Sequence, residues 1–161
     1  MKFHLFCPNL SFINVHKTFE SPFGLFYLQV IGGAIVQASF DDFPCSSSRG
    51  SPTDAKAFMD DVLAYCSMFS ICPNGTVFQK KTWDCIASIK PGHTRSYVEI
   101  AKKMGNPKAT RAVASAIAGN PIAYVIPCHR VIRANGHAGS YRWNPARKKM
   151  ILEYEKLTLD E

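Results

Sequence analysis

A polar triplet interrupts an apolar stretch near residue 128 and contains the most reactive side-chain types of this chain. Residues 122–126 read Ile-Ala-Tyr-Val-Ile, Pro127 follows, and Cys128-His129-Arg130 then precede a second apolar pair, Val131-Ile132. A cysteine is nucleophilic only as the thiolate, and a neighbouring imidazole can accept its proton. Positive charge nearby also favours the thiolate. This arrangement predicts that Cys128 is a nucleophile activated by His129, rather than an inert core thiol.

The other cysteines show no pattern that predicts cross-linking or metal binding. Their spacings are irregular, no Cys-x-x-Cys pair occurs, and polar residues interrupt the apolar patch at the start of the chain, which argues against a signal peptide. We therefore expect a cytoplasmic protein (or one associated with the nucleoid or nucleus) without a disulfide framework, whose remaining thiols fill the core. The six cysteines are Cys7, Cys45, Cys66, Cys72, Cys85 and Cys128.

The composition is that of a globular protein with an uneven charge. Of the 161 residues, 47% are hydrophobic and 12% aromatic, enough for one compact domain or two small lobes. No run of about 18 apolar residues occurs, so we expect no membrane span. Residues 80–150 contain 14 Lys and Arg but 2 Asp and Glu, whereas residues 1–79 contain 4 and 6. A basic half beside a neutral half is typical of a polyanion-binding protein, although a solvated basic surface gives the same count.

The first half of the chain predicts a hairpin followed by a helix. Residues 24–30 and 34–40 are predicted strands, and Gly32-Gly33 between them is a hairpin turn signal. Residues 45–52 form a loop by composition, and Pro73-Asn74-Gly75 marks the boundary between two lobes. A helix is predicted over 54–66, with an apolar face of Phe58, Val62, Leu63 and Cys66.

Three helices are predicted after this boundary, in the basic half of the chain. Thr76 caps one that runs to about Ile89, Ser96 caps a second over about 97–104, and a third spans about 109–118. A tight break at Gly105-Asn106-Pro107 separates the second from the third. Two helices joined by a short turn in a basic region resemble a helix-turn-helix, although such helix pairs are common.

The third helix has an unusual composition for one that binds DNA. A helix that reads bases in the major groove usually carries Arg, Asn or Gln on its outer face. Residues 109–118 instead carry small side chains and a single long cation, Arg111. Small side chains allow the backbone to approach a narrow groove closely, and Arg111 can then reach into the base stack. A buried, alanine-rich packing helix is the alternative interpretation.

The segment Pro127-Cys-His-Arg-Val131 resembles the motif of the O6-alkylguanine-DNA alkyltransferases, the methylated-DNA–protein-cysteine methyltransferases. The resemblance is continuous from Gly75 to about Glu155 and looser in the first half, where Ser21-Pro-Phe-Gly24 is similar to the family's N-terminal lobe. Further matching motifs are Ile89-Lys-Pro-Gly-His-Thr-Arg-Ser-Tyr97, Asn106-Pro-Lys-Ala-Thr-Arg-Ala-Val113 and Gly119-Asn120-Pro121.

This resemblance implies a direct-reversal DNA repair protein, a methylated-DNA–protein-cysteine S-methyltransferase. The helix-turn-helix would dock in the minor groove, and an O6-alkylated guanine would be flipped out because its substituent is inaccessible inside the duplex. Cys128 would displace the alkyl group from O6 and keep it as a thioether, so each molecule acts once. No metal or cofactor is implied, because the sulfur is both nucleophile and final acceptor.

The resemblance also assigns catalytic roles to individual residues. Glu155, His129 and a water would form a relay that supplies the thiolate of Cys128. Asn120 would brace the turn between the DNA-binding helix and the cysteine.

Contacts with DNA are assigned in the same way. Arg111 would occupy the gap left by the extruded nucleotide, and Tyr97 would help to turn its phosphate. Further DNA contacts are expected at Thr110, Ala112, Ser115 and Arg130. The base pocket is expected to contain Tyr97, Val131, Tyr141 and Arg142.

The implied fold belongs to the α+β class and has two domains. Residues 1–74 would form a small lobe of a β-hairpin and a helix, of RNase H-like type. Residues 75–161 would form a mostly helical, winged-helix-like helix-turn-helix domain that binds DNA and accepts the alkyl group. We expect a monomer whose partner is double-stranded DNA containing O6-alkylguanine, with O4-alkylthymine as a second candidate lesion.

Two other classes of function fit several of these features. A non-catalytic protein that binds alkylated DNA would share the helix-turn-helix, but relatives of that kind replace the cysteine. A helix-turn-helix transcription factor would fit the basic half, but helix 109–118 lacks base-reading side chains. Alternatives for single residues are Glu153 in place of Glu155, Arg130 and Lys148 as phosphate-facing cations, and a weak zinc pattern at His4, Cys7 and His16.

Overall fold

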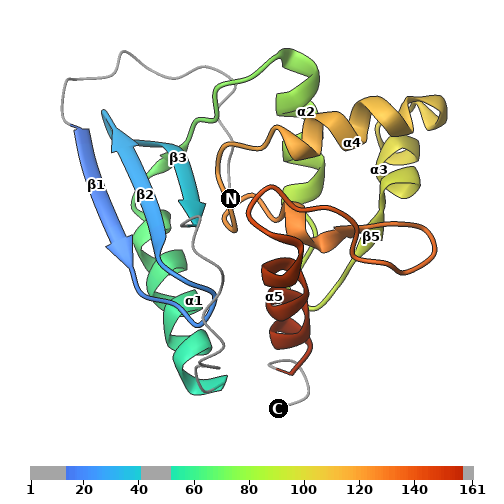
Figure 1. Cartoon of the computed structure of the whole chain (residues 1–161). Helices are drawn as coiled ribbons and strands as arrows, with labels where there is room; N and C mark the ends of the chain where they lie inside the picture. The colour runs from blue at the N-terminus through green and yellow to red at the C-terminus, as the bar shows by residue number, and fades with distance from the viewer. Residues whose placement is uncertain (1–13, 41–51, 158–161) are drawn as a thin grey trace. The chain divides into compact units, whose positions relative to one another are not determined.

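The computed structural model describes residues 14–40 and 52–157, which separate into two compact units (Figure 1). The N-terminal unit contains the described residues up to Asn74 together with Pro121–Val125, and the C-terminal unit contains the rest. A sheet with one helix in the first unit and a mostly helical second unit confirm the α+β class. Cys7, Cys45 and the greater part of the predicted loop 45–52 lie outside the described residues.

The N-terminal unit is built on a four-stranded sheet. The hairpin predicted around Gly32-Gly33 is confirmed, and both glycines adopt positive φ (55° and 77°), which glycine does without strain. The first strand has no counterpart in the prediction, because residues 14–18 are all exposed and carry no alternating pattern. In sheet order, the strands are β1 (Asn14–Phe19), β2 (Phe26–Ile31), β3 (Ala34–Phe40) and β4 (Ser70–Ile71).

Helix α1 (Pro52–Ser67) packs on this sheet through aromatic rings. The ring of Phe58 lies 5.6 Å from that of Phe26 and 5.5 Å from that of Tyr124. The predicted inner face of the helix is confirmed for Phe58, Val62 and Cys66, which are buried. Leu63 does not belong to that face, because it is 41% exposed.

The apolar segment 122–126 is buried, and its backbone turns instead of continuing as a strand. Ile122 makes one isolated parallel bridge with Ala38 of β3. Pairing ends there because the chain turns, and Tyr124 adopts a positive φ of 64°. Apolar composition alone therefore indicated burial correctly but not backbone conformation.

The cysteines differ in their chemical state. Cys66, Cys85 and Cys128 are free thiols, whereas Cys72 is disulfide-bonded. We expected Cys72 to be a core thiol outside any disulfide, and its disulfide bond corrects that expectation. The spacing of cysteines in the sequence does not show which of them come within bonding distance in the fold. Burial raises the pKa of Cys66 to about 12, which fits an inert core thiol.

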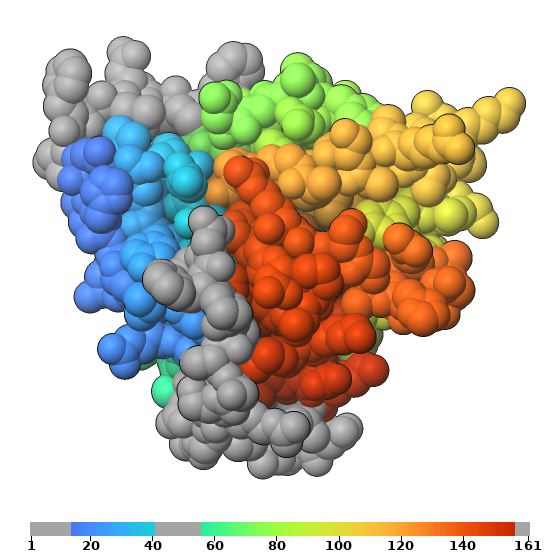
Figure 2. Space-filling model, viewed as in Figure 1, coloured from blue at the N-terminus to red at the C-terminus, as the bar shows by residue number. Residues whose placement is uncertain are grey.

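The C-terminal unit begins with three helices that pack against one another, and Figure 2 shows their green-to-orange surfaces side by side. The predicted caps at Thr76 and Ser96 are confirmed, and each forms a capping box with the side chain three residues later. The helices are α2 (Val77–Ala87), α3 (Tyr97–Lys103) and α4 (Thr110–Ala118), and the 3-10 turn η1 (Pro107–Ala109) precedes α4.

A short parallel strand pair positions the reactive segment. Strand β5 (Arg95–Ser96) pairs with β6 (Val131–Ile132), which directly follows the 3-10 turn η2 (Cys128–Arg130). This pairing brings the start of α3 close to the cysteine, although the two are far apart in the sequence. Helix α5 (Pro145–Leu157) packs against η2. Strands of two residues carry no periodicity, so neither was predictable.

Trp83 anchors the helical core of this unit. It is fully buried, and its indole N–H donates to the backbone carbonyl of Ala116 at 2.8 Å, which fastens α2 to α4. A Cβ atom at Gly75 would lie 2.5 Å from Cη2 and 2.7 Å from Cζ3 of the indole. Gly75 is therefore required by the close approach of Trp83.

We expect Gly75→Ala to lower the free energy of unfolding by about 1 to 3 kcal/mol, because the new methyl group overlaps an indole that cannot shift. Trp83→Phe removes the overlapping ring atoms, so adding Gly75→Ala to Trp83→Phe should change stability by less than about 0.5 kcal/mol. Urea denaturation of the two single variants and the double variant measures this coupling. Additive losses would contradict the explanation.

Candidate active site

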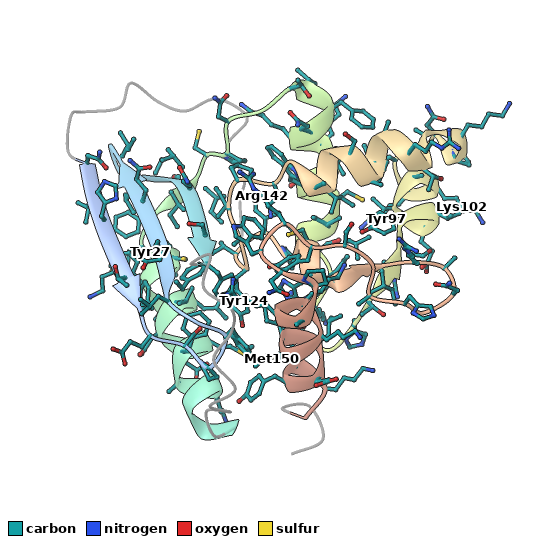
Figure 3. The ribbon with its side chains drawn as sticks, in the orientation of Figure 1. Tyr27, Tyr97, Lys102, Tyr124, Arg142 and Met150 are labelled. Atoms are coloured by element: carbon teal, nitrogen blue, oxygen red, sulfur yellow. The ribbon has the colours of Figure 1, made fainter. Side chains whose placement is uncertain are left out.

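A pocket of about 690 Å³ in the C-terminal unit opens beside Cys128. Two of its lining residues, Tyr97 and Arg142, are labelled in Figure 3. A pocket with an apolar lining and a few polar groups is the usual form of a small-ligand site. The lining residues are Tyr97, Thr110, Arg111, Ala114, Ile117, Ala118, Cys128, Arg133, Ser140, Tyr141, Arg142 and Trp143.

Cys128 is 4% exposed and has the side chain of Asn120 as a hydrogen-bond partner. The amide Nδ2 of Asn120 donates to Sγ of Cys128 at 3.1 Å and to the carbonyl of Ile126 at 3.0 Å. Burial raises the pKa of the Cys128 thiol, while the amide of Asn120 and the charge of Lys148 oppose this effect. The resting thiol therefore keeps its proton, and a base must remove it before the sulfur can react.

Behind the cysteine, a buried carboxylate joins two basic side chains. His129 Nε2 lies 3.0 Å from Oε1 of Glu155, and both side chains are fully buried. Arg130 donates to the same carboxylate from Nη2 at 2.7 Å and from Nε at 3.0 Å. The guanidinium compensates a charge that would be very unfavourable alone in the interior. Glu155, and not Glu153, thus lies beside the histidine.

The position of Arg130 corrects the expectation that it faces DNA. Only 9% of Arg130 is exposed, and its Nη1 donates to the carbonyl of Ile89 at 2.7 Å. Arg130 lies on η2 and donates to Ile89, in the segment before β5, and to Glu155 on α5. These hydrogen bonds connect the three parts of the unit. The role of Arg130 is to hold the carboxylate, because its donors are already engaged inside the unit.

The charges of this group determine the tautomer of the histidine. Burial alone would raise the pKa of Glu155, but hydrogen bonds from His129 and Arg130 and the positive charge of Arg130 lower it to about 2. Burial lowers the pKa of His129, although Glu155 opposes this. The ionised carboxylate can only accept, so Nε2 of the neutral ring carries the hydrogen. Nδ1 then has the lone pair and can accept a proton.

The alternative interpretation of Lys148 as a phosphate-facing cation is wrong, because this residue of α5 is buried. It is 1% exposed, and its Nζ donates to the carbonyl of Val131 at 2.7 Å. Burial lowers the pKa of Lys148 to about 8. Lys148 precedes the buried Ile151 by three residues and the buried Glu155 by seven, so all three lie on the same face of the helix. This helical spacing is the sequence signal that could have predicted its burial.

Helix α4 presents a small-residue surface with one arginine. Arg111 and Thr110 line the pocket, and Arg111 is exposed. Ala112 and Ser115 are exposed on the same helix but lie outside the pocket lining. The opposite face of α4 contributes Val113, Ala116 and Ile117 to the core.

Aromatic and cationic side chains form the rest of the pocket wall. Tyr97 is half-buried, and burial and the proximity of Cys128 raise the pKa of its phenol, which therefore remains a donor. The ring of Tyr141 lies 5.3 Å from that of Trp143, and the guanidinium of Arg142 stacks over Trp143 at 5.7 Å. Arg133 also lines the pocket, although no sequence motif predicted it.

Val131 is expected in the base pocket but is not part of its lining. Its side chain is buried and its carbonyl accepts the ammonium of Lys148. A carbonyl oxygen has two lone pairs, so this contact leaves one acceptor position for a base.

Neither a metal group nor a membrane span emerges from the described part of the chain. Within residues 14–40 and 52–157, no three His, Cys, Asp or Glu side chains converge as metal ligands would. Of the described helices, none combines the length and the apolar character that crossing a membrane requires. Of the weak zinc pattern, only His16 is described, and it is exposed.

Comparison with known proteins identifies the family. Residues 77–157 match the family model described as the DNA-binding domain of 6-O-methylguanine DNA methyltransferase. The matched residues are half of the chain and contain the whole pocket and the Arg130–Glu155–His129 group. The chain belongs to the 6-O-methylguanine DNA methyltransferase family.

Individual relatives agree with this assignment. The chain is 35% identical over 152 residues to the methylated-DNA–protein-cysteine methyltransferase of Mycobacterium leprae, an alignment that covers 87% of this chain and 91% of that protein. It is 48% identical over 81 residues to the bifunctional transcriptional activator/DNA repair enzyme Ada of Escherichia coli, covering 50% of this chain and 23% of Ada. For several such relatives, the chain spans between 23% and 54% of their length.

A solved structure shows the same fold. The Mycobacterium tuberculosis protein OGT, crystallised in complex with DNA, matches 91% of this chain and 99% of its own with 33% identity and a TM-score of 0.71.

Because the carboxylate of Glu155 is buried and ionised, we expect the free energy of unfolding to fall at acidic pH. The pKa of Glu155 is lowered from 4.5 to about 2, so its contribution is complete above pH 4.5 and is lost as the pH falls toward 2. We expect about 2 kcal/mol of unfolding free energy to be lost between pH 5 and pH 3 through this group alone.

Urea denaturation of the native chain, Glu155→Gln and Glu153→Gln at both pH values measures this contribution. Glu153 is exposed on the same helix and provides the matched control. Glu155→Gln should show the smaller pH dependence, and Glu153→Gln should retain that of the native chain. Equal slopes for the two variants would refute the assignment.

Proposed function

We propose that this chain repairs DNA by moving an alkyl group from O6 of guanine to the sulfur of Cys128. The observation that carries the proposal is the position of that thiol: it lines the pocket, accepts a hydrogen bond from Asn120 and is followed by the histidine held by Glu155. Membership of the methyltransferase family and the likeness to a relative crystallised with DNA support it.

The first step is removal of the thiol proton. His129 is neutral and has its acceptor nitrogen at Nδ1, because Nε2 is bound to Glu155. The proton passes to Nδ1 through a bridging water, as the family resemblance implies. Glu155 then stabilises the imidazolium, while Asn120 and Lys148 stabilise the thiolate.

The second step is displacement at the alkyl carbon. The thiolate attacks, a carbon–sulfur bond forms, and the bond between that carbon and O6 breaks. The electron pair of the broken bond stays on the oxygen, and the base takes up the proton that the thiol released, which restores guanine. The thioether is stable and this chain offers no evident group to cleave it, so each molecule reacts once without a cofactor.

Access to the base requires flipping, since O6 of a paired guanine is not reachable inside the duplex. The exposed side of α4 would enter the minor groove with Ala112 and Ser115 against the backbone and Thr110 at the pocket rim. Arg111 would fill the vacated position. Tyr97 would donate to the extruded nucleotide.

The extruded base would be held by the remaining pocket residues. Tyr141 and Arg142 would contact its faces and edges, and the backbone at Val131 would accept a hydrogen bond from it. We propose double-stranded DNA with O6-alkylguanine as the substrate of a monomer, with O4-alkylthymine as a second lesion. We also propose that residues 1–74 form the N-terminal lobe and residues 75–161 form the domain that binds DNA and accepts the alkyl group.

Intact mass spectrometry tests the proposed acceptor. After incubation with a duplex that contains O6-methylguanine, we expect the chain to gain one methyl group, and peptide mapping to place it on Cys128. Cys128→Ser should bind the duplex and gain no mass, whereas Cys85→Ser should react like the native chain. Binding of the damaged duplex by the native chain without any mass change would overturn the proposal.

A second measurement tests the flipping role of Arg111. Arg111→Ala should slow methyl transfer from duplex DNA by at least about tenfold, since unstacking a base costs a few kcal/mol. Reaction with the free base O6-benzylguanine needs no flipping and should change by less than about twofold. Lys108→Ala removes a nearby exposed cation and should show only a salt-dependent loss of binding. Equal losses on both substrates for Arg111→Ala would contradict the role.

A further inference from the structure

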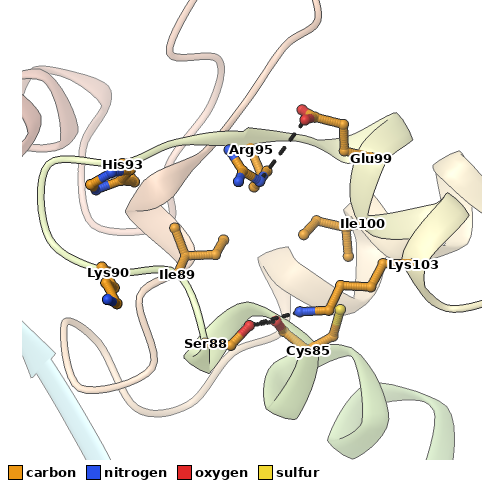
Figure 4. Close-up of a pocket in the computed structure, with 9 residues that line it drawn as sticks. All are labelled: Cys85, Ser88, Ile89, Lys90, His93, Arg95, Glu99, Ile100 and Lys103. Carbon is orange, nitrogen blue, oxygen red and sulfur yellow. Dashed lines mark hydrogen bonds and ion pairs between the residues drawn. The ribbon is translucent and has the colours of Figure 1, made fainter.

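A second pocket in the C-terminal unit shares no lining residue with the pocket at Cys128. It has a volume of about 410 Å³ and lies among the end of α2, the segment 88–95 and the outer side of α3 (Figure 4). Two buried side chains, Ile89 and Ile100, contribute apolar surface to it. The proposed repair reaction uses none of its side chains.

Three cations from three elements converge on this pocket. Lys90 follows α2, Arg95 lies on β5, and Lys103 is in the last turn of α3. The one carboxylate of the lining, Glu99, accepts hydrogen bonds from the backbone and hydroxyl of Ser96 and lies 3.9 Å from Arg95. Within the described ranges, no carboxylate pairs with Lys90 or Lys103, so positive charge is in excess.

The pocket is held in shape before any ligand arrives. Nζ of Lys103 donates to Oγ of Ser88 at 2.8 Å, which keeps the ammonium beside the cavity. The segment that carries Lys90 is fixed from within, because Arg130 donates to the carbonyl of Ile89 and the backbone N–H of Gly92 donates to Glu155. A preformed site loses less conformational entropy on binding.

We propose that this pocket binds a phosphate group, either in a free anion or in a nucleic-acid backbone. Concave walls of low dielectric concentrate the positive potential of Lys90, Arg95 and Lys103. Guanidinium and ammonium groups form charge-assisted hydrogen bonds with phosphate oxygens, and a guanidinium can bind two of them at once. The site is distinct from the alkyl acceptor, and the binding does not depend on the repair reaction.

Cys85 provides a local reporter of occupancy. It is a partly exposed free thiol that lines this pocket. Burial raises the pKa of Cys85, and the charge of Lys103 opposes that rise. A bound phosphate covers the thiol and neutralises Lys103, so both effects slow alkylation of Cys85.

The experiment follows alkylation of Cys85 by iodoacetamide, through mass spectrometry of its peptide, in the whole chain at constant ionic strength. Pyrophosphate is titrated in one series and an undamaged DNA duplex in another. We expect saturable protection by pyrophosphate, with a midpoint raised about tenfold in Lys103→Gln and in Lys90→Gln. Lys102→Gln removes the same charge from the neighbouring position of α3 (labelled in Figure 3) and should leave the midpoint unchanged.

The two series distinguish the sources of phosphate. Protection by the duplex at lower concentration than pyrophosphate supports a nucleic-acid backbone, and protection by pyrophosphate alone supports a free phosphate compound. The proposal is overturned if neither protects Cys85, or if Lys102→Gln raises the midpoint as much as Lys103→Gln. Methyl transfer to Cys128 is measured separately, so failure here leaves the repair proposal intact.

Discussion

The buried contact between Arg130 and Glu155 is the interaction on which the rest of the C-terminal unit depends. Through it, one carboxylate accepts from η2, from the histidine beside the reactive cysteine and from the backbone at Gly92. Removing either partner would leave an uncompensated charge inside the unit, which costs about 3 to 5 kcal/mol. A hydrophobic pair of similar size could fill the same space without that risk. The charged group is therefore explained by what it does to His129: it sets the tautomer and orients the ring.

The same interior that holds this group also keeps Cys128 inactive at rest. Burial raises the pKa of the thiol, so the sulfur carries its proton until a base takes it. Asn120 and Lys148 work in the opposite direction, since an N–H donor and a cation both favour the thiolate. The thiol is therefore neutral at rest, and Asn120 and Lys148 reduce the cost of ionising it once a base takes the proton.

Sequence patterns correctly predicted the features that depend on interactions between residues close together in the sequence. The caps at Thr76 and Ser96 and the hairpin at Gly32-Gly33 follow from backbone hydrogen bonding within a few residues. Cys128 and His129 were predicted from the polar triplet between two apolar runs, and Glu155 was predicted through the family resemblance. The inward positions of Arg130 and Lys148 were missed, because a cation in a basic half-chain looks like a surface group. Which cation finds a buried acceptor depends on contacts between residues 25 and 17 positions apart, and no local pattern encodes those contacts.

The pocket at Cys128 and the pocket beside α3 show how basic charge can serve different purposes in one fold. Beside Cys128, Arg130 and Lys148 are buried and engaged, so their effect is confined to the pKa of the thiol and the position of the carboxylate. On the outer side of α3, Lys90, Arg95 and Lys103 are exposed around a cavity and retain their capacity to attract an anion. Burial determines this difference, because the donors of a buried cation are already occupied inside the unit. An exposed cation can still bind an anion and attracts it over roughly a Debye length, about 10 Å at 0.1 M salt. Net charge alone therefore predicts a polyanion partner, but the placement of each cation decides whether it attracts that partner or prepares the sulfur.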